Sequence, residues 1–556
     1  MKIMKKIIKI FSVTLLFMTL QACKKELVEV TNINQPSVDV LTSEAAILQF
    51  AKGGVYINGI QSNTIDDSFF NSTAGSGFLL YAYGFHETMG DVIFCPYGNA
   101  NFKFLDNPTY FKIDDGTTVN NPIGLNQPYE TKLRNSRVYG KANSFLYEWT
   151  AMYFMNNALN VLLSKVDNTI FSGDAATKKN VLKAWAYWWK GYAYSRIGSL
   201  YIAGVITDEP NKTNGNFVTN TAIIDEATKN FDKAASILKT LKSGGAYDDV
   251  LKVVIPGYCQ TGKGGIPNPD AWIRNINTYK ARNIIVNKRV KDMTATDWTQ
   301  ILTLTETGIQ DADPVFVAKT FGDNSKSILD KDAGWVGALT ATESSSFFVS
   351  ERLIQDFRAG DARFTNNFEL RASPIVNIRS RGIGFGTRYF LVDGGNGNGA
   401  YTYVHTQDYG SDDIFLAGSF EENELIKAEA KIRNGKVADG LSLIHKVRTL
   451  QSSGLKAPLR SLSATEALEE LRSERRIALL FRGLSFYDAR RNGVIDDVLK
   501  GGGRANGVVL TSSGGKTIVN TKTFINYNYL SYWDVPQNDL DFNAPSANAA
   551  PVKTPN

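Results

Sequence analysis

Apolar residues recur every three or four positions over long stretches of this chain, and this spacing limits the possible folds more than any other feature. In residues 142–165, for example, Phe145, Trp149, Met152 and Met155 follow one another at such steps. Steps of three and four place side chains on one face of an α-helix. The spacing therefore predicts an amphipathic helix that buries this face against a neighbour.

The same spacing predicts a series of helices, which we expect to pack as antiparallel pairs. Alanine and aromatic residues alternate along them, which is typical of tetratricopeptide-like units, although the strict consensus of such repeats is absent. Five tryptophans fall on these helices and are expected in the core: Trp149, Trp185, Trp188, Trp189 and Trp272. The further helices are expected at 177–198, 225–241, 272–290, 418–433, 436–452 and 464–481.

Other segments are rich in glycine, asparagine and aromatic residues. Residues 53–140 have little sustained period and are expected to form long loops with short helices, and residues 291–342 are mixed. The run 388–392 is strand-like, and a polar, glycine-rich tail closes the chain. Because no linker divides the sequence, we predict a mainly α fold: a single domain of tetratricopeptide-like helix pairs, with a loop-rich ligand face and few short strands.

The N-terminus has the pattern of an export signal. Lysines at positions 2, 5, 6 and 9 precede an apolar stretch at 10–20 that is too short to span a bilayer in the mature protein. The following Leu20-Gln21-Ala22-Cys23 resembles a bacterial lipobox, in which the cysteine is lipidated; the alternative is an ordinary secretory signal. We predict a lipoprotein signal peptide at 1–22, a tether at 23–45 that carries a fatty acyl chain such as palmitate on Cys23, and a folded domain at 46–556.

Charge and cysteine content exclude several classes of protein. The formal net charge is +6, and removal of the four leader lysines leaves 57 basic against 55 acidic residues, or +2. With no basic stripe, this balance argues against a nucleic-acid partner. The three cysteines and three histidines are not spaced as a metal site. Cys95 and Cys259 could form a disulfide or remain two thiols.

The signatures of common enzymes are absent. We find no Gly-x-Ser-x-Gly elbow, no Walker A loop, and no segment that indicates the paired carboxylates of a glycoside hydrolase. A charged cluster near Gly483 could suggest an active site, but arginine forks bind carboxylates bidentately, so we expect a structural ion-pair network. We therefore expect no catalysis and no cofactor. The cluster consists of Glu474, Arg475, Arg476, Arg482, Asp488, Arg490 and Arg491.

Several stretches, in order along the chain, resemble the SusD/RagB family of nutrient-binding lipoproteins. They are a helix of small and aromatic residues at 185–198, a Trp-then-Asn helix at 272–282, an Asp-x-Arg at 361–363, an Ala-Glu-Ala at 428–430, a Glu-Arg pair at 474–475, a Phe-x-Gly at 481–483, an Asp-x-x-Arg at 488–491 and an aromatic-x-x-Pro at 533–536. The resemblance is least clear in residues 24–140 and 291–342, where family members vary because ligand contacts arise there.

This resemblance implies a helical, non-enzymatic protein anchored in the outer membrane by its lipid and facing the exterior. Its partner would be a SusC-like TonB-dependent transporter, to which it would deliver a glycan or oligosaccharide. Two alternatives stay open. The cargo could be a peptide, as in some relatives, or the protein could be a structural lid of the transporter with little ligand affinity of its own.

A sugar site needs exposed aromatic rings, which stack on the apolar faces of pyranoses, among short polar side chains on loops held by a rigid body. Residues 66–110 best fit this description, and Trp335 lies between two glycines in the second variable stretch. The alternative is that most of these rings pack beneath the loops. The predicted ligand-binding residues are Asp67, Phe69, Tyr81, Tyr83, Phe85, Tyr97, Asn99 and Trp335.

Overall fold

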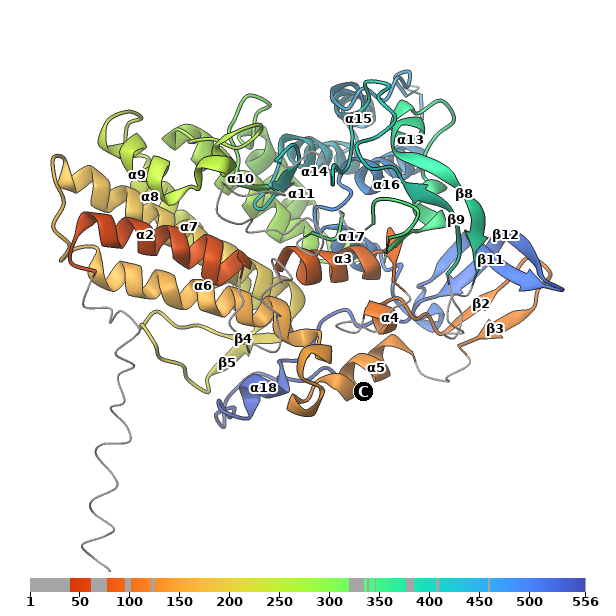
Figure 1. Cartoon of the computed structure of the whole chain (residues 1–556), viewed down its shortest axis with the longest axis horizontal. Coiled ribbons are helices and arrows are strands. Elements are labelled where there is room, and N and C mark those ends of the chain that lie inside the picture. The colour runs from red at the N-terminus through yellow and green to blue at the C-terminus, as the bar shows by residue number, and fades with distance from the viewer. Residues whose placement is uncertain are drawn as a thin grey trace, which may run out of the picture.

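The chain is mainly helical in the computed structural model, which confirms the predicted fold class. Helices make up most of the molecule on the left of Figure 1, and most strands lie together on its right. The structure describes residues 41–61, 78–95, 102–121, 126–319, 335–337, 340–345, 347–376, 385–406, 410–458 and 461–555.

Three long helices that follow one another in sequence pack together at one end of the molecule (Figure 1). α8 begins before the segment that its apolar spacing indicated. Thr219 caps it by accepting the backbone N–H of Ala222, and Asp225 lies within the helix rather than at its start. α7 packs against both of its sequence neighbours, as the predicted pairing of consecutive helices requires. The three are α6 (Phe145–Lys165), α7 (Ala175–Leu200) and α8 (Asn220–Leu238).

A glycine allows α7 and α8 to approach closely. A Cβ atom at Gly191 would lie 2.6 Å from the ring of Phe231, so only glycine fits there. Beside this contact the Phe231 ring packs 5.1 Å from the ring of Trp188. The tryptophans that were expected in the core are buried, with at most 4% exposure: Trp149, Trp185, Trp188, Trp189 and Trp272.

The remaining long helices extend this body toward the C-terminal part of the chain. Two of them begin with capping boxes, in which Thr294 pairs with Asp297 and Ser463 pairs with Glu466. Successive helices again pack together, α10 with α11, α14 with α15, and α15 with α16. Their bounds are α2 (Glu44–Val55), α9 (Ala246–Val254), α10 (Pro269–Val286), α11 (Ala295–Glu306), α14 (Phe420–Arg433), α15 (Val437–Leu450) and α16 (Ala464–Ala478).

One long hairpin stands out among the strands. β11 (Arg504–Ser513) and β12 (Lys516–Asn526) are joined by Gly514 and Gly515, both with positive φ, as a tight primed turn requires. The expectation of a polar tail in this region is therefore wrong. β12 continues the sheet into β2 (Tyr110–Lys112), so residues far apart in sequence form one sheet.

The other strands form short pairs, and the remaining helices are short. The strands are β1 (Ile93–Phe94), β3 (Thr118–Asn120), β4 (Ala203–Val205), β5 (Phe217–Thr219), β6 (Val317–Lys319), β7 (Phe348–Val349), β8 (Phe368–Ile375), β9 (Thr387–Leu391) and β10 (Asp413–Phe415). The helices are α3 (Tyr83–Met89), α4 (Phe102–Leu105), α5 (Gln127–Arg134), α12 (Glu351–Ile354), α13 (Ala362–Asn367), α17 (Ser485–Arg491) and α18 (Gln537–Leu540), with π-helical turns η2 (Tyr56–Gln61) and η3 (Phe78–Ala82) and 3-10 turns η5 (Arg137–Ala142), η6 (Gly257–Gln260), η7 (Val290–Asp292) and η9 (Val498–Lys500).

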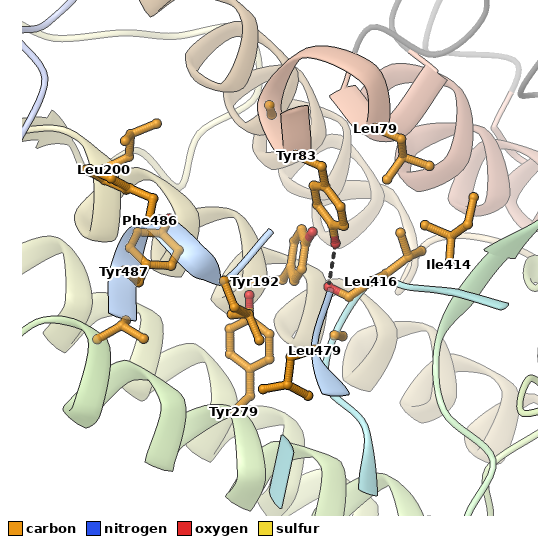
Figure 2. Packing of buried hydrophobic residues seen from close by; sticks show 14 of the residues in the cluster. Leu79, Tyr83, Tyr192, Leu200, Tyr279, Ile414, Leu416, Leu479, Phe486 and Tyr487 are labelled. Atoms are coloured by element: carbon orange, nitrogen blue, oxygen red, sulfur yellow. Dashed lines mark hydrogen bonds between the residues drawn. The ribbon is translucent and has the colours of Figure 1, made fainter. Parts of the chain in front are cut away.

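α3 lies at the centre of the core, and all seven of its residues are buried. Figure 2 shows Tyr83 of this helix pointing toward Leu416 and lying near Tyr192 of α7. The polar members of α3 have buried partners. His86 Nε2 lies 2.9 Å from Glu148 Oε2, and Glu148 also accepts a hydrogen bond from Arg196 at 2.5 Å. The helix thus joins the long helices of the body to the C-terminal segments.

Candidate functional site

Four of the predicted ligand-binding residues lie outside the described residues: Asp67, Phe69, Tyr97 and Asn99. The predicted lipidation site, Cys23, also lies outside them. Ligand contact by the four residues and lipidation of Cys23 stay predictions. The other four candidates are described, and their surroundings decide whether they can face a ligand.

Tyr83 and Phe85 belong to the core and not to an exposed loop. Each is 1% exposed. The Tyr83 hydroxyl donates to the carbonyl of Phe415 at 2.9 Å, and the Phe85 ring packs 4.7 Å from the ring of Phe102 and 5.9 Å from that of Trp533. The expectation that these two rings are exposed is wrong, because α3 is buried on every side. The helix also has no polar face, so its sequence does not show the pattern of an amphipathic helix.

Tyr81 lies in η3, one turn before α3, and is half-buried. Its ring lies 4.4 Å from the ring of Tyr147 and 6.0 Å from that of Phe102. Burial raises the pKa of its hydroxyl. Among the described aromatic candidates, Tyr81 is therefore the one that is only partly buried.

Trp335 is also a packing residue. Its side chain is 5% exposed, and its ring meets that of Phe481 edge-on at 5.8 Å. Gly337 lies beneath the indole, where a Cβ atom would come within 2.8 Å of the ring. The neighbouring glycine that suggested exposure therefore makes room for the buried ring, and the expectation of an exposed Trp335 is wrong.

The described residues enclose a cleft of about 950 Å³. This volume is within the range of small-molecule sites, which is roughly 300–1,000 Å³. Its lining comes from the end of α3, the segment that follows α12, the C-terminal part of α14, one face of α16, α17 and the start of β11. Most of the lining is polar, and arginine is its most frequent residue.

Ion pairs organise the arginines of this cleft. Arg491 binds Glu429 through both terminal nitrogens, at 2.9 and 2.7 Å, and its Nε donates to Asp488 at 2.7 Å. Arg475 donates to the other oxygen of Asp488 at 2.8 Å. Burial alone would raise the pKa of Asp488, but Arg475 and Arg491 outweigh it and hold that pKa below its usual value. The prediction of a structural ion-pair network is confirmed for these residues.

A second group of pairs centres on Asp356. Arg472 and Arg476 donate to its two carboxylate oxygens at 2.7 and 2.6 Å, and Arg504 approaches to 3.5 Å. Burial lowers the pKa of the Arg476 guanidinium, and the nearby cations Arg504 and Arg472 act in the same direction, against the attraction of Asp356. Several cations therefore share one anion in this part of the cleft.

Asp91 is a buried residue of the cleft lining and was not singled out as an ion-pairing residue from the sequence. Arg352 donates to both of its oxygens, and the Tyr527 hydroxyl donates to one of them at 2.5 Å. Burial opposes ionisation, but Arg352 outweighs it and lowers the pKa of Asp91 to about 2. No local signal links residues 91, 352 and 527, because their pairing depends on the packing of distant segments.

Two further expectations concern cysteines and metal ligands. Cys95 and Cys259 are both buried, and no disulfide joins them. Burial raises the pKa of the Cys259 thiol to about 12. Within the described part of the chain no group of three or more His, Cys, Asp or Glu side chains could hold a metal ion. A membrane-spanning helix is likewise not found there, since none of the described helices is long and apolar enough.

Comparison with protein-family models and with curated sequences gives no match. Solved structures, in contrast, match over nearly the whole chain. A SusD-like carbohydrate binding protein from Bacteroides vulgatus ATCC 8482 is 16% identical, with a TM-score of 0.54 over 92% of this chain and 98% of that one. Surface glycan-binding protein A from Bacteroides fluxus is 14% identical, with a TM-score of 0.52 over 92% of this chain and 98% of that one. A SusD superfamily protein from Parabacteroides distasonis ATCC 8503 is 12% identical, with a TM-score of 0.51 over 91% of this chain and 98% of that one.

This chain has the SusD-like fold. The SusD-like fold confirms what the resemblance implied about architecture, including a body of paired helices. The match extends over 92% of the chain, so it also includes much of the N-terminal third, where the sequence resemblance was least clear. At identities of 12–16% the comparison concerns the fold, and the chemistry has to come from this chain's own side chains.

Proposed function

We propose that this protein is a surface-exposed outer-membrane lipoprotein of the SusD/RagB family, which binds a glycan or oligosaccharide and delivers it to a SusC-like TonB-dependent transporter. The observation that supports this proposal is the SusD-like fold over 92% of the chain, shared with a carbohydrate binding protein and with a surface glycan-binding protein. The order of the sequence motifs that resemble the family agrees with it.

The proposed glycan site lies on the loops between 53 and 140. It includes Asp67, Phe69, Tyr97 and Asn99, together with the partly buried Tyr81. The described side of this region is rigid, since the rings of Tyr81, Phe85, Phe102 and Tyr147 pack together within 4.4–6.1 Å of their neighbours. A rigid base of this kind is what holds binding loops in position.

The proposed role is binding and not catalysis. Sugar capture by stacking needs aromatic rings and hydroxyl partners and no cofactor. The charged cluster that could have suggested an active site is largely occupied by its own ion pairs, as in the bidentate contact between Arg491 and Glu429. A glycan-binding protein also explains why no catalytic signature occurs in the sequence.

The proposed anchor is a lipid on Cys23, after removal of residues 1–22. Growth with a radiolabelled or clickable palmitate should label the wild-type protein and leave Cys23→Ser unlabelled. Protease added to intact cells should digest the labelled protein, because the proposal places it on the outer face. Labelling of Cys23→Ser would contradict the anchor, and protection from protease would contradict the exposed location.

The ligand proposal is tested by affinity electrophoresis of the purified protein in gels that contain one neutral or acidic polysaccharide each, with peptide pools tested by calorimetry. We expect retardation by a glycan, reduced about tenfold in affinity by Phe69→Ala or Tyr97→Ala, because loss of one stacked ring costs on the order of 1–1.5 kcal/mol. Heat with peptides alone would favour peptide cargo. Binding of neither ligand, with uptake still dependent on the gene, would favour a structural lid.

A further inference from the structure

The cleft beside α16 and α17 has more cations than its anions can fully pair. Seven arginines line it, against five acidic residues. One of the acids, Asp91, is already bound by Arg352, and one of the arginines, Arg358, is bound by Glu470; neither Arg352 nor Glu470 lines the cleft. The arginines are Arg358, Arg433, Arg472, Arg475, Arg476, Arg491 and Arg504, and the acids are Asp91, Asp356, Glu429, Glu469 and Asp488.

The sharing of anions leaves three of these arginines weakly paired. Arg433 lies 3.7 Å from Glu429, whose carboxylate Arg491 already binds bidentately. Arg504 lies 3.5 Å from Asp356, which two closer arginines already occupy. Arg475 shares Asp488 with Arg491. Each of these guanidiniums keeps capacity to donate to a further oxyanion, because a guanidinium has five N–H donors.

Arg475 gives the sharpest evidence for such a ligand. Its side chain is 3% exposed, and its Nη1 is buried with no hydrogen-bond acceptor in the described structure. Leaving a buried charged donor without an acceptor is costly, so such groups are rare in folded proteins and point to a binding role. Arg475 lines the cleft, and an entering oxyanion would supply the missing acceptor once the side chains that cover Nη1 move aside.

We propose that this cleft binds an acidic saccharide through its carboxylate or sulfate group, with Arg475 as the buried donor and Arg433 and Arg504 as the more exposed ones. This inference rests on the proposed glycan-binding function and adds a charged subsite to it. The volume of about 950 Å³ accommodates sugar residues in addition to the anionic group. Short polar groups for sugar hydroxyls are also present in the lining: Thr465, Ser473, Asn492 and Asn506.

The structure favours a saccharide over a peptide in this cleft. An extended peptide would bind most readily by adding a strand to the free edge of β11. That edge is already covered, because Gln355 donates to the Asn506 carbonyl at 2.6 Å and accepts the Val508 N–H at 3.3 Å. Arg352 donates a hydrogen bond to the Val508 carbonyl at 2.9 Å. The backbone groups that a peptide would need are therefore occupied.

Calorimetry of the purified protein tests the inference with five probes. They are an oligogalacturonide, a sulfated heparin-derived oligosaccharide, a neutral maltooligosaccharide of matched length, a hexapeptide with a free C-terminus, and sodium sulfate alone. We expect heat with one of the two acidic saccharides, weakened when sodium chloride is raised from 50 to 500 mM, because salt screens the charges at the partly exposed arginines.

Charge variants of the lining then locate the site. Arg433→Gln should weaken binding of the acidic saccharide about tenfold, a usual effect of losing one charge-assisted hydrogen bond. Glu469→Gln removes a 59% exposed acid from the lining and should tighten binding severalfold. Arg274→Gln is the matched control, since Arg274 is similarly exposed and ion-paired to Asp313 but does not line the cleft, and it should change nothing. Arg475→Lys should keep the charge and lose affinity.

The outcomes separate this inference from the proposed function. Acidic-saccharide binding with opposite effects of Arg433→Gln and Glu469→Gln supports the cleft. If an acidic saccharide binds and neither variant changes its affinity, the proposed site in the cleft is overturned, while the proposed glycan-binding function stands. Binding of the neutral saccharide alone has the same two consequences. Sodium sulfate binding as tightly as the saccharides overturns a saccharide subsite in favour of an ion site. Binding of the peptide alone, or of no probe, overturns both proposals.

Discussion

Glu87 accepts the backbone N–H of Gly483 at 2.8 Å, which ties the central helix α3 to the turn between α16 and α17. Ser485 donates to the same carboxylate at 3.2 Å. Burial raises the pKa of Glu87 to about 7, although these two hydrogen bonds act in the opposite direction. The connection between the two parts of the core is therefore made by a carboxyl group that changes its charge near neutral pH.

This raised pKa makes part of the folding stability depend on pH. Between the ordinary glutamate pKa of 4.5 and about 7, the folded state keeps the Glu87 proton that the unfolded state has lost, so stability falls as the pH rises through this window. Over about two and a half units the loss is roughly 3 kcal/mol. Glu87→Gln has the same shape and cannot ionise. We expect the variant to match the wild type at pH 4 and to be more stable by about 3 kcal/mol at pH 8.

Chemical denaturation at both pH values measures this difference. The control is Glu209→Gln, a 67% exposed side chain paired with Lys212 on the surface. It should give the same small difference from the wild type at pH 4 and pH 8, within about 0.5 kcal/mol. A Glu87→Gln variant that is destabilised equally at both pH values would show that the buried carboxyl does not carry this pH dependence.

The contribution of Asp91 to folding stability should depend on pH in the opposite direction to that of Glu87. Arg352 lowers its pKa against the effect of burial from 3.8 to about 2, so its contribution is present above pH 3.8 and is lost as the pH falls toward 2. Asp91→Asn breaks a buried pair and should cost about 3–5 kcal/mol at pH 7. The gap to the wild type should narrow by about 2 kcal/mol at pH 2. Urea denaturation with Asp167→Asn, a 64% exposed residue, as control tests both statements.

The close approach of α7 and α8 gives a prediction about packing. A Cβ atom at Gly191 would lie 2.6 Å from Phe231, so Gly191→Ala should destabilise the protein by about 1–3 kcal/mol. Adding Phe231→Leu should recover part of this loss, because it removes the ring that the new methyl group meets. Gly257→Ala is the control, since no atom lies within 4 Å of its Cβ position. Equal effects of the two alanine variants in thermal unfolding would contradict the steric explanation.

Long helices could be predicted from sequence because the spacing of their apolar residues by three or four repeats over many turns, although every residue of α7 from Trp188 to Leu200 is buried. α6, α7, α14, α15 and α16 all lie within a few residues of the predicted ranges. α3 could not be predicted in this way, since its seven residues span only about two turns and show no alternation of apolar and polar positions. The β11–β12 hairpin was missed although Gly514-Gly515 between two β-rich runs is a recognised turn signal.

Some features of the candidate site could likewise be predicted from the sequence, and others could not. The pairing of arginines with acids near Gly483 could be predicted, because their number and charge are visible in the sequence. The sequence could not predict which arginines share one anion. Asp356 and Arg504, for example, come to the cleft from segments more than a hundred residues apart. Exposure of single aromatic residues was the weakest prediction, since glycines beside a ring, as at Trp335, also occur where a buried ring needs room.

That distinction between buried and accessible rings leads to a prediction about the aromatic candidates. Phe85→Ala removes a buried ring that contacts Phe102 and Trp533, so it should cost about 3–5 kcal/mol in unfolding free energy. Any loss of glycan binding should then follow the loss of folded protein. Tyr81→Phe keeps the ring and its packing, so its unfolding midpoint should stay near that of the wild type, and only a ligand that hydrogen-bonds the hydroxyl should bind more weakly. Thermal unfolding and calorimetry on the same samples separate the two effects. A stable Phe85→Ala protein that no longer binds glycan would mean that this ring is exposed to ligand, contrary to the packing described above.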